Sequence, residues 1–147
     1  MQISAESQKQ LKRFLVVGFS SVAIDCITYF VALKCGLARE PSKAIGYISG
    51  MLVGFVLNKT WTFRSQGKIG SEIATYFFLY CVTFIANLAV NYAVVRFFYD
   101  ISNGSAVLIM AFFSATFVTT VLNFLGMRFI TFKKGIAARE SLDSNTQ

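Results

Sequence analysis

The chain has 147 residues, a length that suits one domain, but 55% of them are apolar and only 14% are charged. A water-soluble surface carries about 25–35% charged residues, so this composition excludes an ordinary soluble domain and predicts a protein solvated by lipid. The net charge of +7 comes from short basic clusters between apolar blocks, which favours a membrane protein over a nucleic-acid-binding one.

The apolar residues fall into four blocks. A polar segment, residues 1–13, precedes them, and a polar tail follows, which we expect to be mobile. Each block has about the 20 residues that a helix needs to cross the hydrocarbon core, and backbone groups in lipid must pair internally. We therefore predict an all-α membrane protein with four transmembrane helices in one domain, residues 14–132. The predicted blocks are 14–33, 44–63, 73–95 and 101–127, and the cytoplasmic tail is 133–147.

The distribution of Lys and Arg predicts the orientation. Ten of these residues fall on the side of the two termini and the middle link, and four fall on the other side. The side richer in Lys and Arg faces the cytoplasm in multi-pass proteins, so we expect both termini to be cytoplasmic. The four on the opposite side are Lys34, Arg39, Lys43 and Arg96.

An internal repeat relates the second and fourth blocks. The stretch VLN occurs at 56–58 and again at 121–123, while KTWTF at 59–63 matches RFITF at 128–132 with an offset larger by four residues, about one helical turn. The first and third blocks match more loosely. The sequence thus predicts two hairpins arranged as parallel repeats, a pattern known in transporters, although hydrophobic helices also resemble one another by chance. Gly46, Gly50, Gly54 and Asn58 correspond to Ala111, Ala115, Thr119 and Asn123.

At NKTWTF (58–63) and NFLGMRFITF (123–132) the sequence resembles the GtrA-like family of small membrane proteins. In that family the second of four spans ends in Asn-basic-x-aromatic-x-Phe, and the fourth has a related basic-x-x-x-Phe ending. The opening RFLVVGFSSVAIDCITYF (13–30) is also similar to the family's first helix, with an early Gly and a later polar residue. The resemblance covers the chain from about Phe14 to Phe132.

The resemblance implies a function in cell-surface polysaccharide synthesis. Members are thought to move polyprenyl-phosphate-linked sugars across the bacterial inner membrane, often beside a membrane glycosyltransferase. This chain carries no glycosyltransferase domain, so such an enzyme would be a separate protein. A chain this small leaves little room for an enclosed path, which makes a homodimer plausible.

Asp25 lies near the middle of the first block. A charged side chain there costs about 2.5–3.5 kcal/mol on insertion scales, so an acid at this depth is a candidate functional residue. It could bind sugar hydroxyls or take up a proton that drives transport. Alternatively it is neutral, or it pairs with a polar neighbour for packing, for which Thr28, Asn87 and Asn91 are available.

A polar seam for the sugar is predicted around Asp25. Asn87 and Asn91 lie one turn apart on the third block and share a face, and Asn58 and Asn123 add amides at the ends of the second and fourth blocks. Either Asn alone is explained as well by hydrogen bonding between helices. The stripe Gly46, Gly50 and Gly54 is interpreted as a packing surface, within the fold or between protomers.

Basic residues cluster at the cytoplasmic ends of the second and fourth blocks. They could be anchors that extend to the membrane interface, or a cationic ring that captures a lipid phosphate. Lys59 and Arg128 sit inside the repeated motif, between apolar residues, and are the first candidates for phosphate binding. Arg64 and Lys133 are the next.

The sequence gives no sign of an enzyme, a cofactor or a metal site. It has no His, and its three Cys form no CxxC pair. Two alternatives to a flippase remain. One is a non-transporting module that recruits a glycosyltransferase or its lipid substrate. The other is a small multidrug exporter, which would also have four short spans and an acid in the first.

Overall fold

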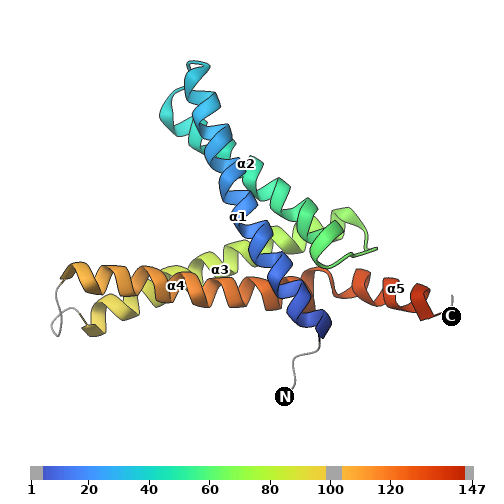
Figure 1. Ribbon diagram of the computed structural model, residues 1–147. Coiled ribbons are helices and arrows are strands. Elements are labelled where there is room, and N and C mark those ends of the chain that lie inside the picture. The colour runs from blue at the N-terminus through green and yellow to red at the C-terminus, as the bar shows by residue number, and fades with distance from the viewer. Residues whose placement is uncertain (1–4, 99–103, 145–147) are drawn as a thin grey trace. The chain divides into compact units, whose positions relative to one another are not determined.

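The computed structural model describes residues 5–98 and 104–144, and all regular structure in these residues is helical (Figure 1). The predicted link between the third and fourth blocks and the start of the predicted span 101–127 lie partly outside the described residues. The chain divides into two compact units, residues 1–66 with 134–147, and residues 67–133. The helices are α1 (Ala5–Lys34), α2 (Arg39–Leu57), η1 (Asn58–Thr62), α3 (Ile69–Phe98), α4 (Gly104–Gly126), η2 (Met127–Thr131) and α5 (Lys133–Ser144), of which η1 and η2 are π-helices.

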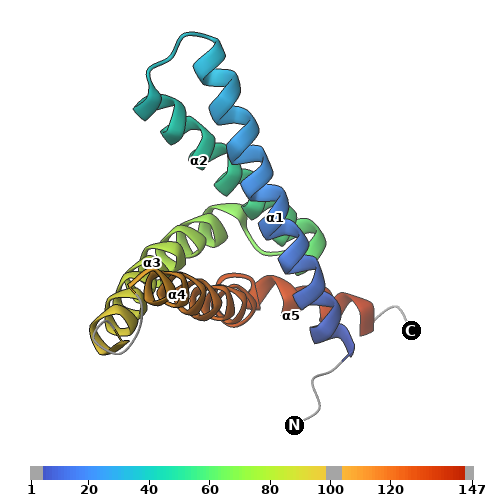
Figure 2. The ribbon, with the colours of Figure 1, turned by 60° about the vertical axis from the view of Figure 1, so that its left-hand side comes forward.

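The first unit is built on a hairpin in which α2 runs back along α1 (Figures 1 and 2). At the end of α1, Gly36 adopts a left-handed backbone (φ 88°), and the Leu37 N–H donates to the Ala32 carbonyl at 3.1 Å. This glycine cap reverses the chain in a few residues. Helix α2 then begins at Arg39, earlier than predicted, because Pro41 is tolerated in a first turn, where N–H groups lack intrahelical partners.

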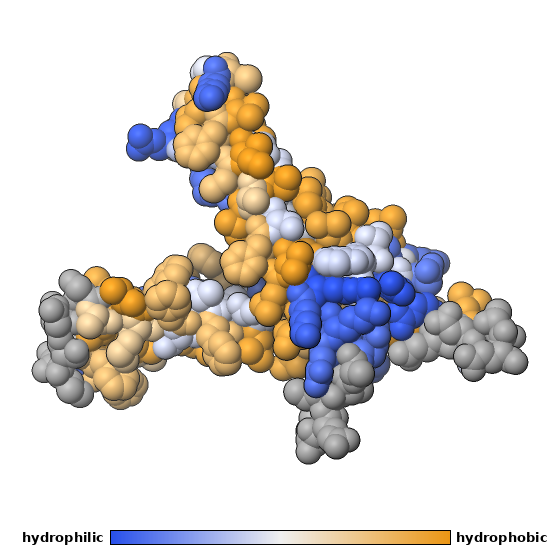
Figure 3. Space-filling model, viewed as in Figure 1, coloured by the Kyte–Doolittle hydropathy of each residue, from blue (hydrophilic) through white to orange (hydrophobic). Residues whose placement is uncertain are grey.

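Three helices are long and apolar enough to cross a membrane, namely Glu6–Lys34, Ile69–Phe98 and Ala106–Thr131. Of their most apolar stretches, only 11%, 17% and 22% lie buried inside the protein, so most of their side chains face outward. Figure 3 shows this apolar colour along both hairpins, with hydrophilic colour at the tip of the first hairpin and at the start of α1. The prediction of an all-helical, multi-pass membrane protein is therefore confirmed.

Helix α2 does not reach the same threshold. It has 19 residues, starts with Arg39 and carries Lys43 in its second turn, and three Gly lower its apolar content. Among the four predicted spans, the second, residues 44–63, is therefore the one for which length and composition give least support. The packing of α2 against α1 is the observation that supports α2 as a span.

The second unit pairs α3 with α4 through small and polar side chains. Val107, Ala111 and Ala115 follow one face of α4 at four-residue steps, and all three are buried. Farther along this face, Thr83 on α3 donates a hydrogen bond to the side-chain oxygen of Asn123 at 2.9 Å. Buried polar groups in a membrane helix need such partners, so this bond both satisfies them and fixes the register of the pair.

Helix α5 occupies most of the tail, for which the sequence pattern predicts no element. The carbonyl of Gly135 accepts a hydrogen bond from the N–H of Gln66 at 3.1 Å, which ties the start of α5 to the end of the first hairpin. Mean hydropathy along α5 is low, so no apolar stripe marks it in the sequence.

Candidate functional site

Asp25 forms an ion pair with Lys43 across the first hairpin. The Lys43 ammonium donates to one carboxylate oxygen at 2.7 Å, and the side chains are 19% (Asp25) and 60% (Lys43) exposed. The second oxygen of Asp25 is buried and has no hydrogen-bond partner among the described residues. The sequence suggested Thr28, Asn87 or Asn91 as partners, but the structure gives Lys43, which the antiparallel course of α2 brings alongside.

Two glycines of α2 make room for this pair. A Cβ on Gly46 would lie 2.6 Å from the unpaired oxygen of Asp25 and 2.7 Å from its backbone carbonyl oxygen. A Cβ on Gly50 would lie 2.6 Å from the carbonyl oxygen of Ser21. Both distances are shorter than real Cβ contacts, so the close approach of α1 and α2 depends on glycine at both positions.

The ion pair affects the titration of Lys43. Its hydrogen bond raises the pKa of Lys43, whose charged form is favoured by the adjacent carboxylate. Because the folded pKa lies above the unfolded one, the stabilisation is fully present at neutral pH and is lost only as the pH rises above about 10.

Breaking this pair on one side should be worse than removing it. We expect Asp25→Asn and Lys43→Gln each to lower the temperature of unfolding in detergent, because the remaining charge loses its partner. The double variant Asp25→Asn with Lys43→Gln leaves two neutral amides and should unfold closer to the native protein. Thermal unfolding followed by size-exclusion chromatography measures all three. Equal effects that simply add in the double variant would mean that the two side chains do not interact.

The second hairpin has neutral pairs where the first has charges. The Asn87 amide donates to the Thr119 hydroxyl at 3.0 Å, and Asn123 pairs with Thr83 as described above. Asn91 lies half-buried one turn farther along α3. Asp25 belongs to the first unit and these amides to the second, so the predicted seam between them remains a prediction.

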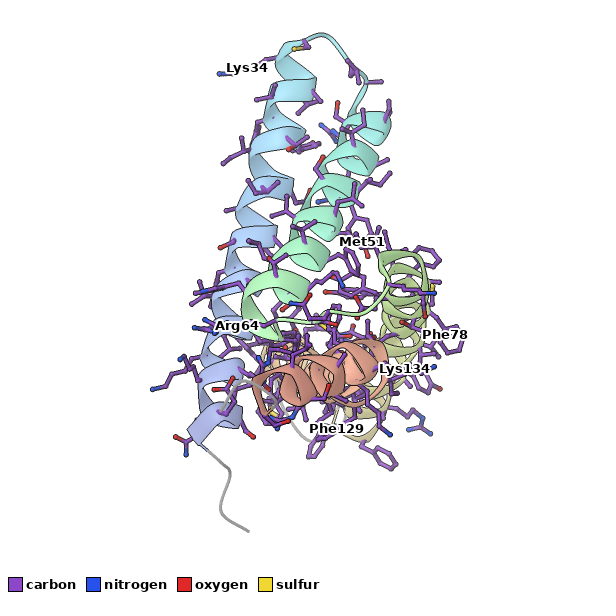
Figure 4. The ribbon with its side chains drawn as sticks, turned by 90° about the vertical axis from the view of Figure 1, so that its right-hand side faces the viewer. Lys34, Met51, Arg64, Phe78, Phe129 and Lys134 are labelled. Carbon is purple, nitrogen blue, oxygen red and sulfur yellow. The ribbon has the colours of Figure 1, made fainter. Side chains whose placement is uncertain are left out.

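The end of the first hairpin is a tight turn built around η1. Phe63 is fully buried and its N–H donates to the Asn58 carbonyl at 2.9 Å, the wide spacing of a π-helix. The Lys59 ammonium folds back and donates to the Ser65 carbonyl at 3.3 Å. Arg64, between them, adopts a left-handed backbone (φ 50°) with its side chain exposed, and Figure 4 places it at the opposite end of the hairpin from Lys34. Lys59 thus helps to shape the turn that presents Arg64.

Asn58 is the buried polar residue of this turn. It is 3% exposed, and its side-chain oxygen has no hydrogen-bond partner among the described residues. The hydroxyl of Thr62, one turn on, is in the same situation. Buried acceptors in a native fold are normally satisfied, and an ordered water inside the turn would satisfy both.

Arg13 joins the same turn from α1 and is not among the residues that the sequence singles out. Its guanidinium donates to the Trp61 carbonyl at 3.0 Å and lies 5.4 Å from the centre of the Trp61 ring. The two residues are 48 positions apart, so no local spacing could reveal the contact. The aromatic residue at position 61 was the available signal, because a guanidinium can pack over an aromatic ring.

The second hairpin ends in the matching way. In η2, Arg128 is half-buried over the Phe129 ring at 5.4 Å, and Thr131 and Phe132 are buried like Thr62 and Phe63. Lys133 is exposed at the first position of α5. Each π-helix therefore carries a basic residue at its second position and is followed by a buried Phe.

A comparison with known protein families identifies the domain to which these residues belong. The family described as GtrA/DPMS, transmembrane domain, matches residues 13–132. The chain belongs to this family. The expected GtrA-like membership is thereby confirmed, over a stretch that begins at Arg13 and contains every candidate site residue except Lys133.

A relative of this GtrA domain is described as a membrane protein. The uncharacterized membrane protein YngA of Bacillus subtilis (strain 168) is 27% identical over 128 residues, which cover 86% of this chain and 82% of that protein. GtrA domains are associated with the translocation of polyprenyl-linked sugars and with glycosylation, and they are generally non-catalytic. In this GtrA domain Asp25, Asn87 and Asn91 lie on the long helices α1 and α3, whereas Lys59 and Arg128 lie in the π-helices of their own units.

Proposed function

We propose that this GtrA domain flips a polyprenyl-phosphate-linked sugar across the bacterial inner membrane, for cell-surface polysaccharide synthesis or glycosylation. The observation that carries the proposal is the pair of π-helices, each presenting a basic residue at the same position. Lys59 and Arg128 are placed there by irregular backbone, which in membrane proteins concentrates at functional sites.

A four-span topology with both termini in the cytoplasm fits the first hairpin. Because α2 packs closely against α1 at Gly46 and Gly50, a bilayer that surrounds α1 also surrounds α2. The η1 turn then shares the side on which α1 begins. Lys9, Lys12 and Arg13 at that end agree with the positive-inside rule.

Two features support the repeat. The π-helices occur at the same offset as the KTWTF and RFITF motifs, so Lys59 corresponds to Arg128. In the looser match of the first and third blocks Asp25 corresponds to Asn87, and each contacts the other helix of its own hairpin: Asp25 pairs with Lys43, and Asn87 donates to Thr119. Two similar hairpins related by an axis along the membrane normal would allow one to rock against the other.

In the proposed cycle the lipid phosphate docks at the basic π-helix ends in the cytoplasmic leaflet, at Lys59, Arg128, Arg64 and Lys133. Arg contributes bidentate hydrogen bonds to phosphate, and Lys contributes a point charge. The sugar enters the polar seam of Asp25 and the asparagines, while the isoprenoid chain stays in lipid. A homodimer would close a path that one small chain leaves open, and a separate membrane glycosyltransferase would supply or use the sugar.

The direct test is a flipping assay. The purified protein is placed in liposomes that contain a fluorescent polyprenyl-phosphate sugar, and an added quencher or enzyme reports how much label stays in the outer leaflet. We expect faster loss of the protected fraction than in protein-free liposomes. Folded protein with no acceleration would contradict the proposal.

A module that recruits a glycosyltransferase is the second candidate, because the Asp25–Lys43 pair has an evident structural purpose in the first hairpin. The neutral double variant Asp25→Asn with Lys43→Gln separates the two. A recruiter should keep both partner binding and glycosylation output, whereas a transporter that uses the acid should keep partner binding and lose output. A multidrug exporter is disfavoured, since an acid paired with Lys43 is poorly suited to a cationic drug; resistance conferred on a sensitive host would contradict this.

A further inference from the structure

The side chain of Arg13 is held in place at the end of the first hairpin by Trp61. We propose that Arg13 and Arg64 together grip the phosphate of the lipid-linked substrate in the cytoplasmic leaflet, with Trp61 holding Arg13 in position. This inference rests on the proposed function and names the residues that recognise the phosphate at this end of the molecule. Neither Arg13 nor Trp61 belongs to the phosphate site that the sequence predicts.

Arg13 has more N–H groups than its hydrogen bond to Trp61 uses. A guanidinium carries five N–H groups, and the structure shows one nitrogen of Arg13 donating to the Trp61 carbonyl at 3.0 Å. The ring contact with Trp61 uses the face of the guanidinium and leaves its edges for hydrogen bonds. Both contacts reduce the motion of a long side chain, so less entropy is lost when a phosphate binds.

Arg64 is presented by a backbone conformation that suits glycine better. Its φ of 50° lies in the left-handed region, where a Cβ is unfavourable. A strained residue that is not glycine is a reason to look for function in its side chain. Here the side chain is exposed, and the hydrogen bond from Lys59 to Ser65 closes the turn around it.

The chemistry of the pair fits a phosphate ester. Two guanidinium groups can each donate two parallel hydrogen bonds to phosphate oxygens, a geometry that ammonium groups do not offer. Trp61, whose ring contacts Arg13, is 40% exposed, and an aromatic side chain at the membrane interface can contact the first isoprene units. The favoured ligand is therefore a polyprenyl phosphate, and an ordinary anionic phospholipid is the alternative source of the same group.

Trp61 makes the test direct, because it is the one tryptophan in the chain. The full-length protein in neutral phosphatidylcholine nanodiscs is titrated with a polyprenyl monophosphate while tryptophan emission is recorded. A phosphate bound by Arg13 while Arg13 stays on the indole brings negative charge close to the ring, so we expect a saturable change in emission. An equal response to phosphatidylglycerol at the same concentrations would overturn the proposal in favour of a general anionic anchor.

Matched variants separate a specific contact from general charge. Since Arg13→Gln also alters the surroundings of Trp61, its lipid affinity is measured by co-purification of radiolabelled polyprenyl phosphate. We expect binding at least about tenfold weaker for Arg13→Gln, because a charge-assisted hydrogen bond is lost. Arg13→Lys should recover only part of the affinity. Lys12→Gln removes the same charge from the adjacent, exposed position and should bind like the native protein.

Arg64→Gly gives the sharpest signature. Glycine adopts the left-handed conformation without strain, so this variant should unfold at the same temperature as the native protein or higher. Its affinity for polyprenyl phosphate should nevertheless fall by about tenfold. Lower stability with unchanged affinity would show that Arg64 is structural and would overturn the proposal.

The outcomes also distinguish this inference from the proposed function. If the native protein flips lipid-linked sugar and Arg13→Gln flips it equally fast, the inference is wrong and the flippase stands. If the native protein binds polyprenyl phosphate through Arg13 and Arg64 but does not flip it, the phosphate site stands and the flippase is wrong. If the native protein binds no polyprenyl phosphate, both are wrong.

Discussion

Replacing Gly50 with alanine is expected to force α1 and α2 apart and to destabilise the protein. The added Cβ would lie 2.6 Å from the Ser21 carbonyl oxygen, which belongs to helix backbone and cannot move aside like a flexible side chain. Overpacking typically costs about 1–3 kcal/mol, and a clash with backbone belongs at the upper end of that range. Gly46→Ala should behave similarly, since its Cβ would meet both the side chain and the backbone of Asp25. Thermal unfolding in detergent, read by size-exclusion chromatography, measures the loss.

Gly18→Ala is the matched control because it makes the same chemical change on α1 where nothing lies within 4 Å of the added Cβ. Alanine is the better helix former by about 1 kcal/mol, so this variant should be as stable as the native protein or more so. The two kinds of glycine are thus expected to give opposite signs. A Gly50→Ala protein as stable as Gly18→Ala would show that the two helices are not in close contact at Gly50.

Replacing Arg128 with glutamine is expected to slow lipid flipping by about tenfold or more, if the π-helix ends bind the phosphate as proposed. Arg128 is half-buried beside Phe129 and is the counterpart of Lys59 in the repeated motif. Arg128→Lys should retain part of the activity, because the charge remains while the bidentate geometry is lost. The liposome flipping assay gives the rate, and the unfolding temperature shows whether the fold survives.

Lys134→Gln provides the control for net charge. Lys134 is exposed near the start of α5, six positions after Arg128, and Figure 4 labels it there. Its removal lowers the charge by the same amount and should leave flipping unchanged. Comparable slowing in both variants would mean that overall positive charge, rather than a phosphate contact at Arg128, governs the rate.

The sequence predicts the helices and their packing faces better than it predicts the partners of polar residues. Apolar block length marks α1, α3 and α4 because spanning a bilayer imposes a minimum length. The small residues of α4 at four-residue steps do lie against α3, since only small side chains let two helices approach closely in lipid. These features depend on local composition and are visible in one segment at a time.

To predict which polar residues pair, one needs the register between two helices, and the composition of a single segment does not contain that register. Lys43 looks like part of a loop until the glycine cap of α1 sets where α2 starts, and only then does it fall opposite Asp25. The contact between Arg13 and Trp61 likewise depends on how α1 and the end of the first hairpin are aligned. The π-helices leave no distinctive composition because a change from i→i+4 to i→i+5 bonding needs no particular side chain. The four-residue change in repeat offset was the indirect sign that the two hairpins differ near these turns.

The ion pair of the first hairpin has a consequence for how the protein is made. Asp25 leaves the ribosome 18 residues before Lys43, and α1 alone would present a bare carboxylate to the lipid. Pairing with Lys43 lowers that cost, so insertion of α1 and α2 together would be favoured over insertion of α1 alone. Asn87 and Thr119 are uncharged, so α3 has no comparable need to wait for α4. The salt bridge could form once the first 57 residues have been made, because α2 is then complete.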